Sequence, residues 1–390
     1  MTRSEELVYK ICRRSFLSLW SYANPRGKNS GKELCDVLVV CDPDLVIFSV
    51  KEIALTEVGD LNTNWKRWRK RAIDESAKQI YGAERWLKSA KHVIKSDGTI
   101  GLPLPAEKLR RLHRVAVSLG GKGKAPIRFG DLGKGFVHVF DEASLEIVFR
   151  ELDTISDFVD YLSAKETFSR SGRKVLFQGS EEDLLALYLH QGRKFPEQFD
   201  VIVIDDTLWR GFEKRPDYLA KNIANLDSYF WDRMIEVLSR NEPEIGPSTT
   251  EAEIAIRVMA REDRFARRLL GKSFREFLEG RRVRSRMMVA PSGVAYVFLA
   301  VPHGTEPELL QAELENRCFV ARGLNPDCHS VIGIGTEYFV QNGGSQLFLF
   351  YLQMRHWSAD DDAQAKEIQR ALGYFVKPEM KAEHEDEYPT

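Results

Sequence analysis

Two charged residues near the start of this chain lie where simple packing would not place them. Asp36 interrupts the apolar run CDVLVVC at residues 35–41, and Lys51 ends the apolar run LVIFSVK at residues 45–51. Burying either charge alone costs roughly 2–7 kcal/mol or more, so each requires a partner, a metal ion or the mouth of a cleft. The two residues therefore either build a site that binds a ligand or pair with each other at the end of a sheet.

The two apolar runs predict a pair of strands. Only residues 42–44 separate them, and their Asp-Pro-Asp sequence is typical of a tight turn between antiparallel strands. Both runs are apolar on both faces, which is typical of a sheet covered by helices. Because side chains alternate along a strand, Ser49 and Lys51 share one face. We expect Asp36, Ser49 and Lys51 to converge at one end of the hairpin.

A helix before the hairpin supplies a further carboxylate. Residues 4–21 place apolar side chains at helical spacing, with Ser4 as the expected N-cap. Glu5 precedes Val8 by three residues and Cys12 by seven, which sets it at the edge of the buried stripe. The helix can therefore bring Glu5 toward the hairpin.

A long helix from residues 62–64 to about 91 and a strand at 113–121 follow, so the predicted order is α-β-β-α-β. This order resembles the PD-(D/E)XK nuclease superfamily. Its core has a helix carrying a Glu, an Asp-bearing strand paired with a strand that ends in (Asp/Glu)-X-Lys, and a following helix. The resemblance covers residues 1–165, approximately.

The resemblance implies an α/β fold with a restriction-endonuclease-like mixed sheet flanked by helices. It also implies that carboxylates hold Mg²⁺ or Mn²⁺ while the Lys orients or activates water. The corresponding metal ligands would be Asp36, Glu5 and the Val50 carbonyl, with Lys51 as the catalytic base or orienting group. The chain departs from the pattern at Ser49, where the superfamily has an acidic residue. Mg²⁺ needs only one or two carboxylates, so such a site can still bind it.

The expected activity is that of an Mg²⁺-dependent endonuclease acting on DNA rather than RNA. A role in restriction-like or anti-phage defence is an analogy drawn from the resemblance alone. The alternative, given Ser49, is a catalytically silent nuclease fold that binds or senses nucleic acid.

The start of the long helix fits a nucleic-acid partner. Residues 64–71 read NWKRWRKR, which places Trp65 and Trp68 among five cations. Such cations neutralise phosphates, and the rings offer stacking or packing surfaces. In the other interpretation both Trp residues belong to the core and the charges form a solvated face. The candidate nucleic-acid-binding residues of this helix are Lys66, Arg67, Arg69, Lys70 and Arg71.

Gln79 is the one long polar residue of the inward stripe that this helix presents. The resemblance implies a Gln or Lys of this helix at the active site, so Gln79 is a candidate catalytic residue. A buried Gln that bonds only to backbone is the alternative. The Gly-rich segment at residues 120–135 adds Lys122 and Lys124 as candidate contacts to a phosphate backbone, although the segment is better explained as a mobile surface loop.

The overall composition is that of an ordinary globular chain, with 43% hydrophobic and 29% charged residues in 390. Its near-zero net charge hides a division. Residues 1–130 hold 25 Lys and Arg against 14 Asp and Glu, whereas the remainder hold 32 against 44. A basic first part suggests a polyanionic partner there.

The length of the chain predicts two domains. We expect a nuclease-like domain at residues 1–170 and a second α/β domain at 175–390 that regulates, senses or forms a homodimer or partner-subunit contact. The acidic residues 381–390 are expected to be frayed.

No apolar segment is long enough to span a membrane, and Glu5 and Glu6 interrupt the region where a signal peptide would lie. A cytoplasmic protein with no membrane partner is therefore expected. The five cysteines agree with this expectation, because they lie mostly inside apolar runs, where buried free thiols rather than disulfides are expected.

Overall fold

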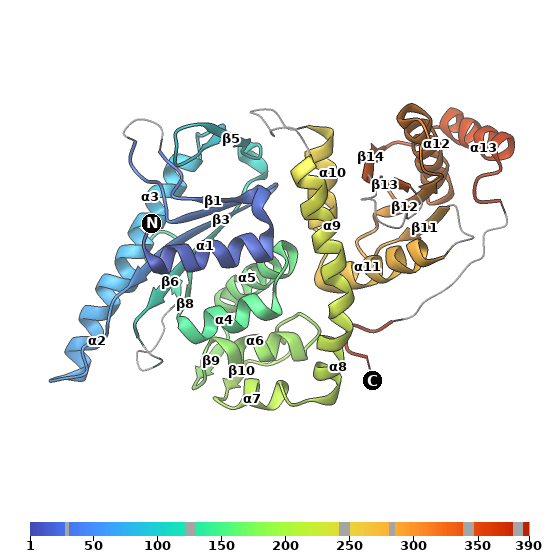
Figure 1. Ribbon diagram of the computed structural model, residues 1–390. Coiled ribbons are helices and arrows are strands. Elements are labelled where there is room, and N and C mark those ends of the chain that lie inside the picture. The colour runs from blue at the N-terminus through green and yellow to red at the C-terminus, as the bar shows by residue number, and fades with distance from the viewer. Residues whose placement is uncertain are drawn as a thin grey trace. The chain divides into compact units, whose positions relative to one another are not determined.

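The computed structural model describes residues 1–27, 31–121, 123, 129–241, 250–280, 285–337, 347–376 and 385–389. The chain divides into two compact units, one formed by residues up to Leu219 and the other from Ala220 onward. Both units combine helices with sheets, which confirms the predicted fold class (Figure 1). Among the residues described, no helix is both long and apolar enough to cross a membrane.

A six-stranded mixed sheet forms the centre of the first unit, in the order β1-β2-β3-β6-β8-β7. The hairpin of β2 and β3 is antiparallel, with Val37 opposite Phe48, and β3 runs parallel to β6. The strands are β1 (Ser21–Ala23), β2 (Val37–Cys41), β3 (Asp44–Glu52), β6 (Arg111–Leu119), β7 (Gly130–Asp131) and β8 (Phe136–Phe140). The predicted hairpin and third strand therefore lie side by side in one sheet.

Helices cover both faces of this sheet. On one face, Leu38 and Ile47 pack in a core with Ile80 and Ala83 of the long helix. On the other face, aromatic rings of α1, α4 and α5 cluster over Phe48. The helices are α1 (Arg3–Phe16), α2 (Leu61–Arg69), α3 (Glu75–Leu87), α4 (Glu142–Glu151) and α5 (Ile155–Arg170). This burial explains why the strands are apolar on both faces.

Two helix boundaries differ from the prediction. Thr2 caps α1 in place of Ser4, whose side chain is buried and donates a hydrogen bond to Glu52. The helix ends at Phe16 rather than near residue 21 because Leu17 has a φ of 69°, which no α-helix continues. The predicted long helix begins after Asp60 and contains a π-helical turn at Lys70–Asp74 between α2 and α3.

The first unit extends past the predicted boundary at residues 170–175. The hydroxyl of Tyr161 in α5 donates to Glu181 of α6 over 2.7 Å, and Lys165 pairs with the same carboxylate. The rings of Phe168 and Phe195 stack with centroids 4.5 Å apart. These buried contacts hold the segment after α5 in the same unit.

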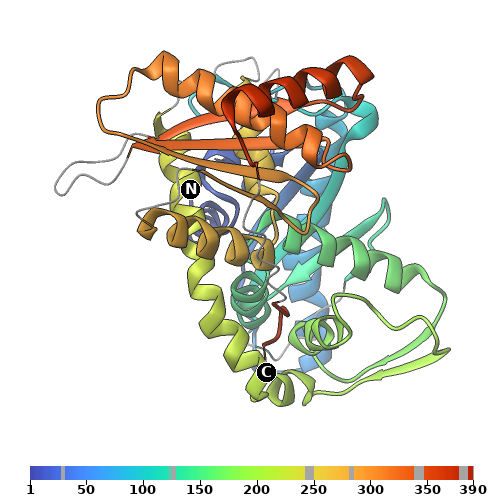
Figure 2. The same ribbon diagram turned by 90° about the vertical axis from the view of Figure 1, so that its right-hand side faces the viewer.

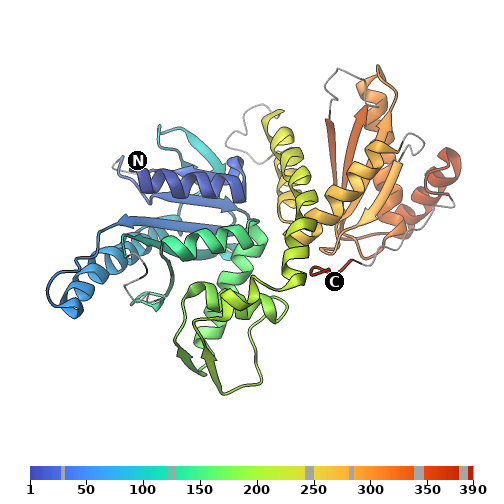
Figure 3. The same ribbon diagram turned by 60° about the horizontal axis from the view of Figure 1, so that its bottom comes forward.

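Smaller elements complete the first unit. The two-stranded sheets are β4 (His92–Ile94) with β5 (Ile100–Pro103), and β9 (Lys174–Phe177) with β10 (Val201–Ile204). The second pair is parallel and lies apart from the main sheet (Figure 3). The remaining helices are α6 (Glu181–His190), α7 (Leu208–Phe212) and α8 (Pro216–Ala224), which leads into the second unit.

The second unit contains a four-stranded sheet in the order β11-β12-β13-β14 (Figure 2). Apolar residues of α12 such as Leu314 pack on one face, and Trp231 and Phe274 contact Phe298 on the other. Its elements are α9 (Ser228–Asn241), α10 (Glu251–Ala260), α11 (Arg264–Glu279), β11 (Ser285–Val289), β12 (Ala295–Val301), α12 (Pro307–Leu324), β13 (Ser330–Glu337), β14 (Leu347–Gln353) and α13 (Ala359–Leu372).

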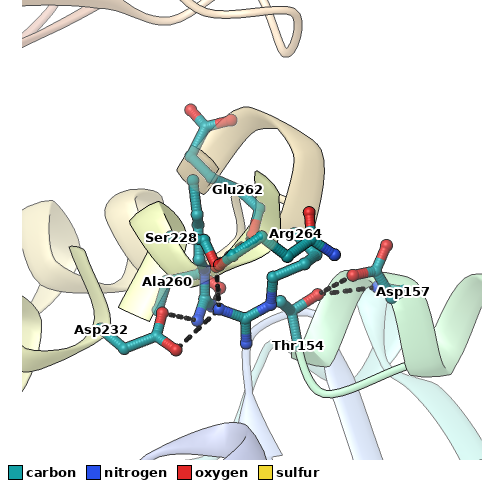
Figure 4. A network of polar contacts seen from close by, with 9 residues as sticks. Thr154, Asp157, Ser228, Asp232, Ala260, Glu262 and Arg264 are labelled. Carbon is teal, nitrogen blue, oxygen red and sulfur yellow. Dashed lines mark hydrogen bonds and ion pairs between the residues drawn. The ribbon is translucent and has the colours of Figure 1, made fainter. Parts of the chain in front are cut away.

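Buried arginines of α11 tie this unit together. Arg264 donates to Ser228 over 3.0 Å and to Asp232 over 2.8 Å, and Arg267 donates to the same carboxylate over 2.7 Å (Figure 4). Arg268 donates to the backbone oxygen of Asp386 over 2.7 Å. Residues 385–389 therefore pack against α11. The expectation that this part of the acidic tail is frayed is wrong.

Candidate active site at the ends of β2 and β3

Asp36 lies immediately before β2 and is 2% exposed. Its backbone N–H donates to the Phe48 carbonyl over 3.2 Å, so the residue continues the pairing of β2 with β3. One carboxylate oxygen accepts a hydrogen bond from the Val50 backbone N–H, and the other accepts one from Gln79 Nε2 over 3.3 Å. The buried carboxylate is therefore fixed by a strand and a helix.

Ser49 joins the same group of side chains. Its hydroxyl donates to Gln79 Oε1 over 2.9 Å, so the Gln79 amide bridges Ser49 and Asp36. The structure brings together these three predicted site residues, from the position just before β2, from β3 and from α3. The alternative interpretation required Gln79 to bond only to backbone. Its amide instead bonds to two side chains, those of Ser49 and Asp36.

Lys51 follows Ser49 on the same face of β3 because side chains alternate along the strand. It is partly exposed near the end of the strand. Within the residues described, no ion pair joins Lys51 to Asp36. The interpretation in which these two residues merely pair at a sheet end therefore has no support in the structure.

Glu33 is a site residue that the sequence reasoning missed. Its Oε2 accepts a hydrogen bond from Asn24 Nδ2 over 3.1 Å, and the Asn24 backbone N–H donates to the Asp36 carbonyl over 3.0 Å, so Asn24 connects the two acidic residues. Partial burial of the carboxyl, followed by the neighbouring Asp36 and Glu5 carboxylates, raises the pKa of Glu33 to about 7. The sequence did contain a signal for Glu33, because it lies three residues before Asp36, directly ahead of an apolar strand.

Glu5 lies near this group but has a structural role as well. Its side chain accepts a hydrogen bond from the Thr2 backbone N–H over 2.8 Å and completes the capping box of α1. Its charge contributes to the raised pKa of Glu33, so it belongs to the electrostatic surroundings of the site.

The oxygen atoms at this position suit a hard cation such as Mg²⁺. In the described part of the chain, no group of three or more His, Cys, Asp and Glu is arranged around a common metal position. Asp36 supplies one carboxylate, and Glu33, which hydrogen-bonds to Asn24 beside it, supplies a second acidic side chain nearby. The Val50 carbonyl points toward the β2 side of β3, as does its N–H, because both backbone groups of one strand residue face the same neighbour. These donors meet the requirement of one or two carboxylates for Mg²⁺.

The tryptophans of α2 belong largely to the core. Trp68 is 3% exposed and its Nε1 donates to the Ile53 carbonyl over 2.7 Å. Trp65 packs against the same core from a half-buried position, with Arg69 6.0 Å from its ring centroid. The core interpretation therefore holds for both rings.

The cations of α2 and of the turn after it lie mostly at the surface. Arg69 is half-buried and approaches Asp74 at 3.6 Å. Lys122 and Lys124 lie outside the described residues. The exposed candidates for phosphate contact are Lys66, Arg67, Lys70 and Arg71.

A scan against protein-family models yields no match for this chain, and comparison with curated proteins and with solved structures yields no significant match either.

Proposed function

We propose that the first unit is a metal-dependent nuclease that hydrolyses phosphodiester bonds of nucleic acid, DNA rather than RNA. The observation that carries the proposal is the position of Asp36 against Val50 and Gln79, with Lys51 on the same strand as Val50. The order α1, β2–β3, α2–α3 and β6 agrees with the superfamily that the sequence resembles. The activity is inferred from the site, because a fold alone does not define a reaction.

Each residue would contribute a distinct part of the chemistry. Asp36, Glu33 and the Val50 carbonyl would hold Mg²⁺ or Mn²⁺, which polarises a phosphodiester and lowers the pKa of bound water. Gln79 keeps the Asp36 carboxylate oriented through its hydrogen bond. Lys51 would orient the attacking water or neutralise a phosphate oxygen. Cations of α2 such as Arg67 would bind the backbone of the nucleic acid.

The alternative is a catalytically silent nucleic-acid-binding or sensor protein. One observation favours it: Ser49 stands at the position of the acidic ligand and uses its hydroxyl to bond Gln79. A neutral hydroxyl is a weaker ligand for Mg²⁺ than a carboxylate. In this alternative the basic residues bind nucleic acid and no hydrolysis follows.

An incubation with plasmid, linear and single-stranded DNA and with RNA, in Mg²⁺ or Mn²⁺, tests the proposal. The wild-type chain is expected to cleave DNA, and Asp36→Ala and Lys51→Ala to abolish cleavage while salt-dependent binding is nearly unchanged. Lys10→Ala removes an exposed cation of α1 that pairs with Glu6 and is the matched control. Binding without cleavage by the wild type would favour the silent alternative.

For the second unit we propose a regulatory, sensing or dimerisation role. The support is indirect: residues 220–390 hold 26 Asp and Glu against 21 Lys and Arg, an acidic balance unsuited to direct contact with a nucleic-acid backbone. Cleavage and oligomeric state of the full chain, compared with those of residues 1–219, test this role.

A further inference from the structure

The last described residues of the chain, 385–389, lie in the second unit and form neither a helix nor a strand (Figure 1). A segment of this kind makes no regular backbone hydrogen bonds of its own, so contacts with neighbouring elements hold it in place. Those contacts come from α8 and α11. The surface that these two helices present therefore already binds a short peptide, which is the end of this chain.

The guanidinium group of Arg268 binds the backbone of this segment. It donates to the carbonyl of Asp386 over 2.7 Å and to that of Glu387 over 3.2 Å. Arg268 is 1% exposed, and its own unit holds it in place: the Phe265 ring centroid lies 4.7 Å from its guanidinium carbon, and Asn225 Oδ1 accepts a hydrogen bond from it over 3.4 Å. Because every residue has a carbonyl, these two bonds do not depend on sequence, and oriented donors lower the cost of binding a peptide.

The Glu385 carboxylate lies between two cations of α11. Its Oε1 accepts a hydrogen bond from Lys272 Nζ over 3.1 Å, and its Oε2 lies 3.4 Å from Arg268 Nε. Hydrogen bonds between charged partners are stronger than neutral ones, and a cationic position excludes basic side chains. The first position of the segment therefore selects an acidic residue.

Tyr388 makes the second side-chain contact. Its ring centroid lies 5.4 Å from Nζ of Lys221, which belongs to α8 and is 2% exposed. An ammonium group within about 6 Å of a ring centroid is attracted to the ring, and more strongly when it is shielded from water. The position three residues after the acidic one therefore selects an aromatic residue.

We propose that α11 and Lys221 form a recognition surface for a short peptide of a partner protein, in which an aromatic residue follows three positions after an acidic one. The chain's own C-terminus occupies this surface in the structure. Three cations contact a segment that contains Glu385, Asp386 and Glu387, which is the charge complementarity of a specific peptide site. The inference extends the sensing role proposed for the second unit and is independent of the nuclease activity of the first.

A partner that carries the same pattern would compete with the C-terminus for this surface. The test measures, by fluorescence anisotropy, binding of a labelled peptide with the sequence of residues 385–390, EDEYPT, to the full chain. A chain with Glu385→Gln and Tyr388→Ala in its own tail is expected to bind the peptide at least about tenfold more tightly than wild type, because a tethered tail competes at an effective concentration of roughly 1 mM. The peptide should also raise the thermal midpoint of this variant and leave that of wild type nearly unchanged.

Peptide variants test the two selective positions. Gln in place of the Glu385 equivalent, or Ala in place of the Tyr388 equivalent, should each weaken binding by about fivefold or more. Lys272→Gln in the chain should reduce the preference for Glu over Gln at the first position, because it removes one of the two cations there. Lys366→Gln, at an exposed ion pair of α13 in the same unit, is the matched control.

Two results would overturn the proposal: no binding of EDEYPT to the tail variant, or equal binding of EDEYPT and a scrambled peptide of the same composition. A wild type that is dimeric by light scattering and becomes monomeric in the tail variant would assign the surface to the tail of a second copy instead of a partner. Tyr388→Ala alone keeps the Glu385 contacts, so it should give a smaller gain in peptide affinity and keeps the test decisive should the double variant misfold. No nucleic acid enters these measurements, so their failure leaves the nuclease proposal untouched.

Discussion

The ammonium group of Lys165 is wholly buried and pairs with the Glu181 carboxylate, joining α5 to α6. It also lies 4.0 Å from the centroid of the Phe129 ring. Burial lowers the pKa of Lys165 and raises that of Glu181, so each group depends on the other to stay charged. The pair connects the main sheet domain to the helices that follow it.

We expect Lys165→Met to lower the free energy of unfolding by about 3–5 kcal/mol, because it leaves a buried carboxylate without its cation. Lys165→Met with Glu181→Leu should recover most of this loss, since two apolar residues leave no unpaired charge. Urea unfolding of the full chain measures both. Equal instability of the single and double variants would contradict the prediction. Lys78→Met, at an exposed ion pair on α3, is the control.

A fragment that ends at residue 170 should not fold cooperatively, whereas residues 1–219 should. The shorter fragment removes Glu181, Tyr188 and Phe195 from contact with Tyr161 of α5. This exposes buried rings and leaves Lys165 without a partner. Amide hydrogen exchange and thermal unfolding of the two fragments distinguish them, and a stable shorter fragment would place the domain boundary where the sequence suggested.

Replacing surface cations of α2 and of the π-helical turn after it should weaken nucleic-acid binding in a salt-dependent way. Removing one cation that neutralises a phosphate is expected to reduce the slope of log K against log salt by about 0.9 for duplex DNA. Arg67→Gln and Arg71→Gln together should therefore flatten the slope by nearly twice that amount. Fluorescence anisotropy across a salt series measures it. Lys78→Gln is the control, since Lys78 already pairs with Glu75 over 2.6 Å. An equal change there would contradict a specific binding surface on α2 and the turn after it.

Glu262 should make the second unit less stable as pH rises. Burial raises the pKa of Glu262 to about 7, although Ser292 and Tyr296 donate hydrogen bonds to its Oε1. Below pH 4.5, the pKa that this carboxyl has in the unfolded chain, it is protonated in both the folded and the unfolded state. Between about 4.5 and 7 the unfolded chain ionises first, so stability is lost across that window.

Glu262→Gln removes this ionisation and keeps the shape of the side chain. Its stability relative to wild type should rise between pH 5 and pH 8, by up to roughly 3 kcal/mol at 1.4 kcal/mol per pKa unit. Thermal unfolding over that range is the measurement. Parallel pH curves for the two chains would show that Glu262 does not titrate in this way.

Removing residues 385–390 should destabilise the second unit by about 1–3 kcal/mol. Arg268 is 1% exposed and donates to the backbone oxygens of Asp386 and Glu387 over 2.7 and 3.2 Å, so the truncation leaves buried donors without those acceptors. Urea unfolding measures the change. Truncation combined with Arg268→Ala should cost less than the sum of the two changes, whereas strict additivity would show that the tail does not depend on Arg268.

Periodicity was enough to predict the hairpin and the position of Gln79. Alternation along β3 set Ser49 and Lys51 on one face, and the inward stripe of α3 set Gln79 toward it; the structure joins Ser49, Gln79 and Asp36 by hydrogen bonds. These features depend on the side-chain periodicity within one strand or one helix, which the sequence pattern shows directly.

Glu33 and the domain boundary could not be found in this way. Glu33 and Asp36 are connected through Asn24, which hydrogen-bonds to the side chain of one and the backbone carbonyl of the other, and no repeat encodes that path. Lys165 reads as a surface cation on a helix, because its buried partner Glu181 lies on another element. Both depend on contacts between segments, which spacing within one element does not reveal.

The hydrogen bond between Gln79 and Asp36 joins residues 43 positions apart. The β2–β3 hairpin can form locally as it leaves the ribosome, but β3 acquires its parallel neighbour only when residues up to Leu119 have been synthesised. α3 packs against both β3 and β6, so its packing on the sheet is complete only after that crossover has formed. A nascent chain therefore contains the β2–β3 hairpin well before Gln79 can hold the Asp36 carboxylate in its final orientation.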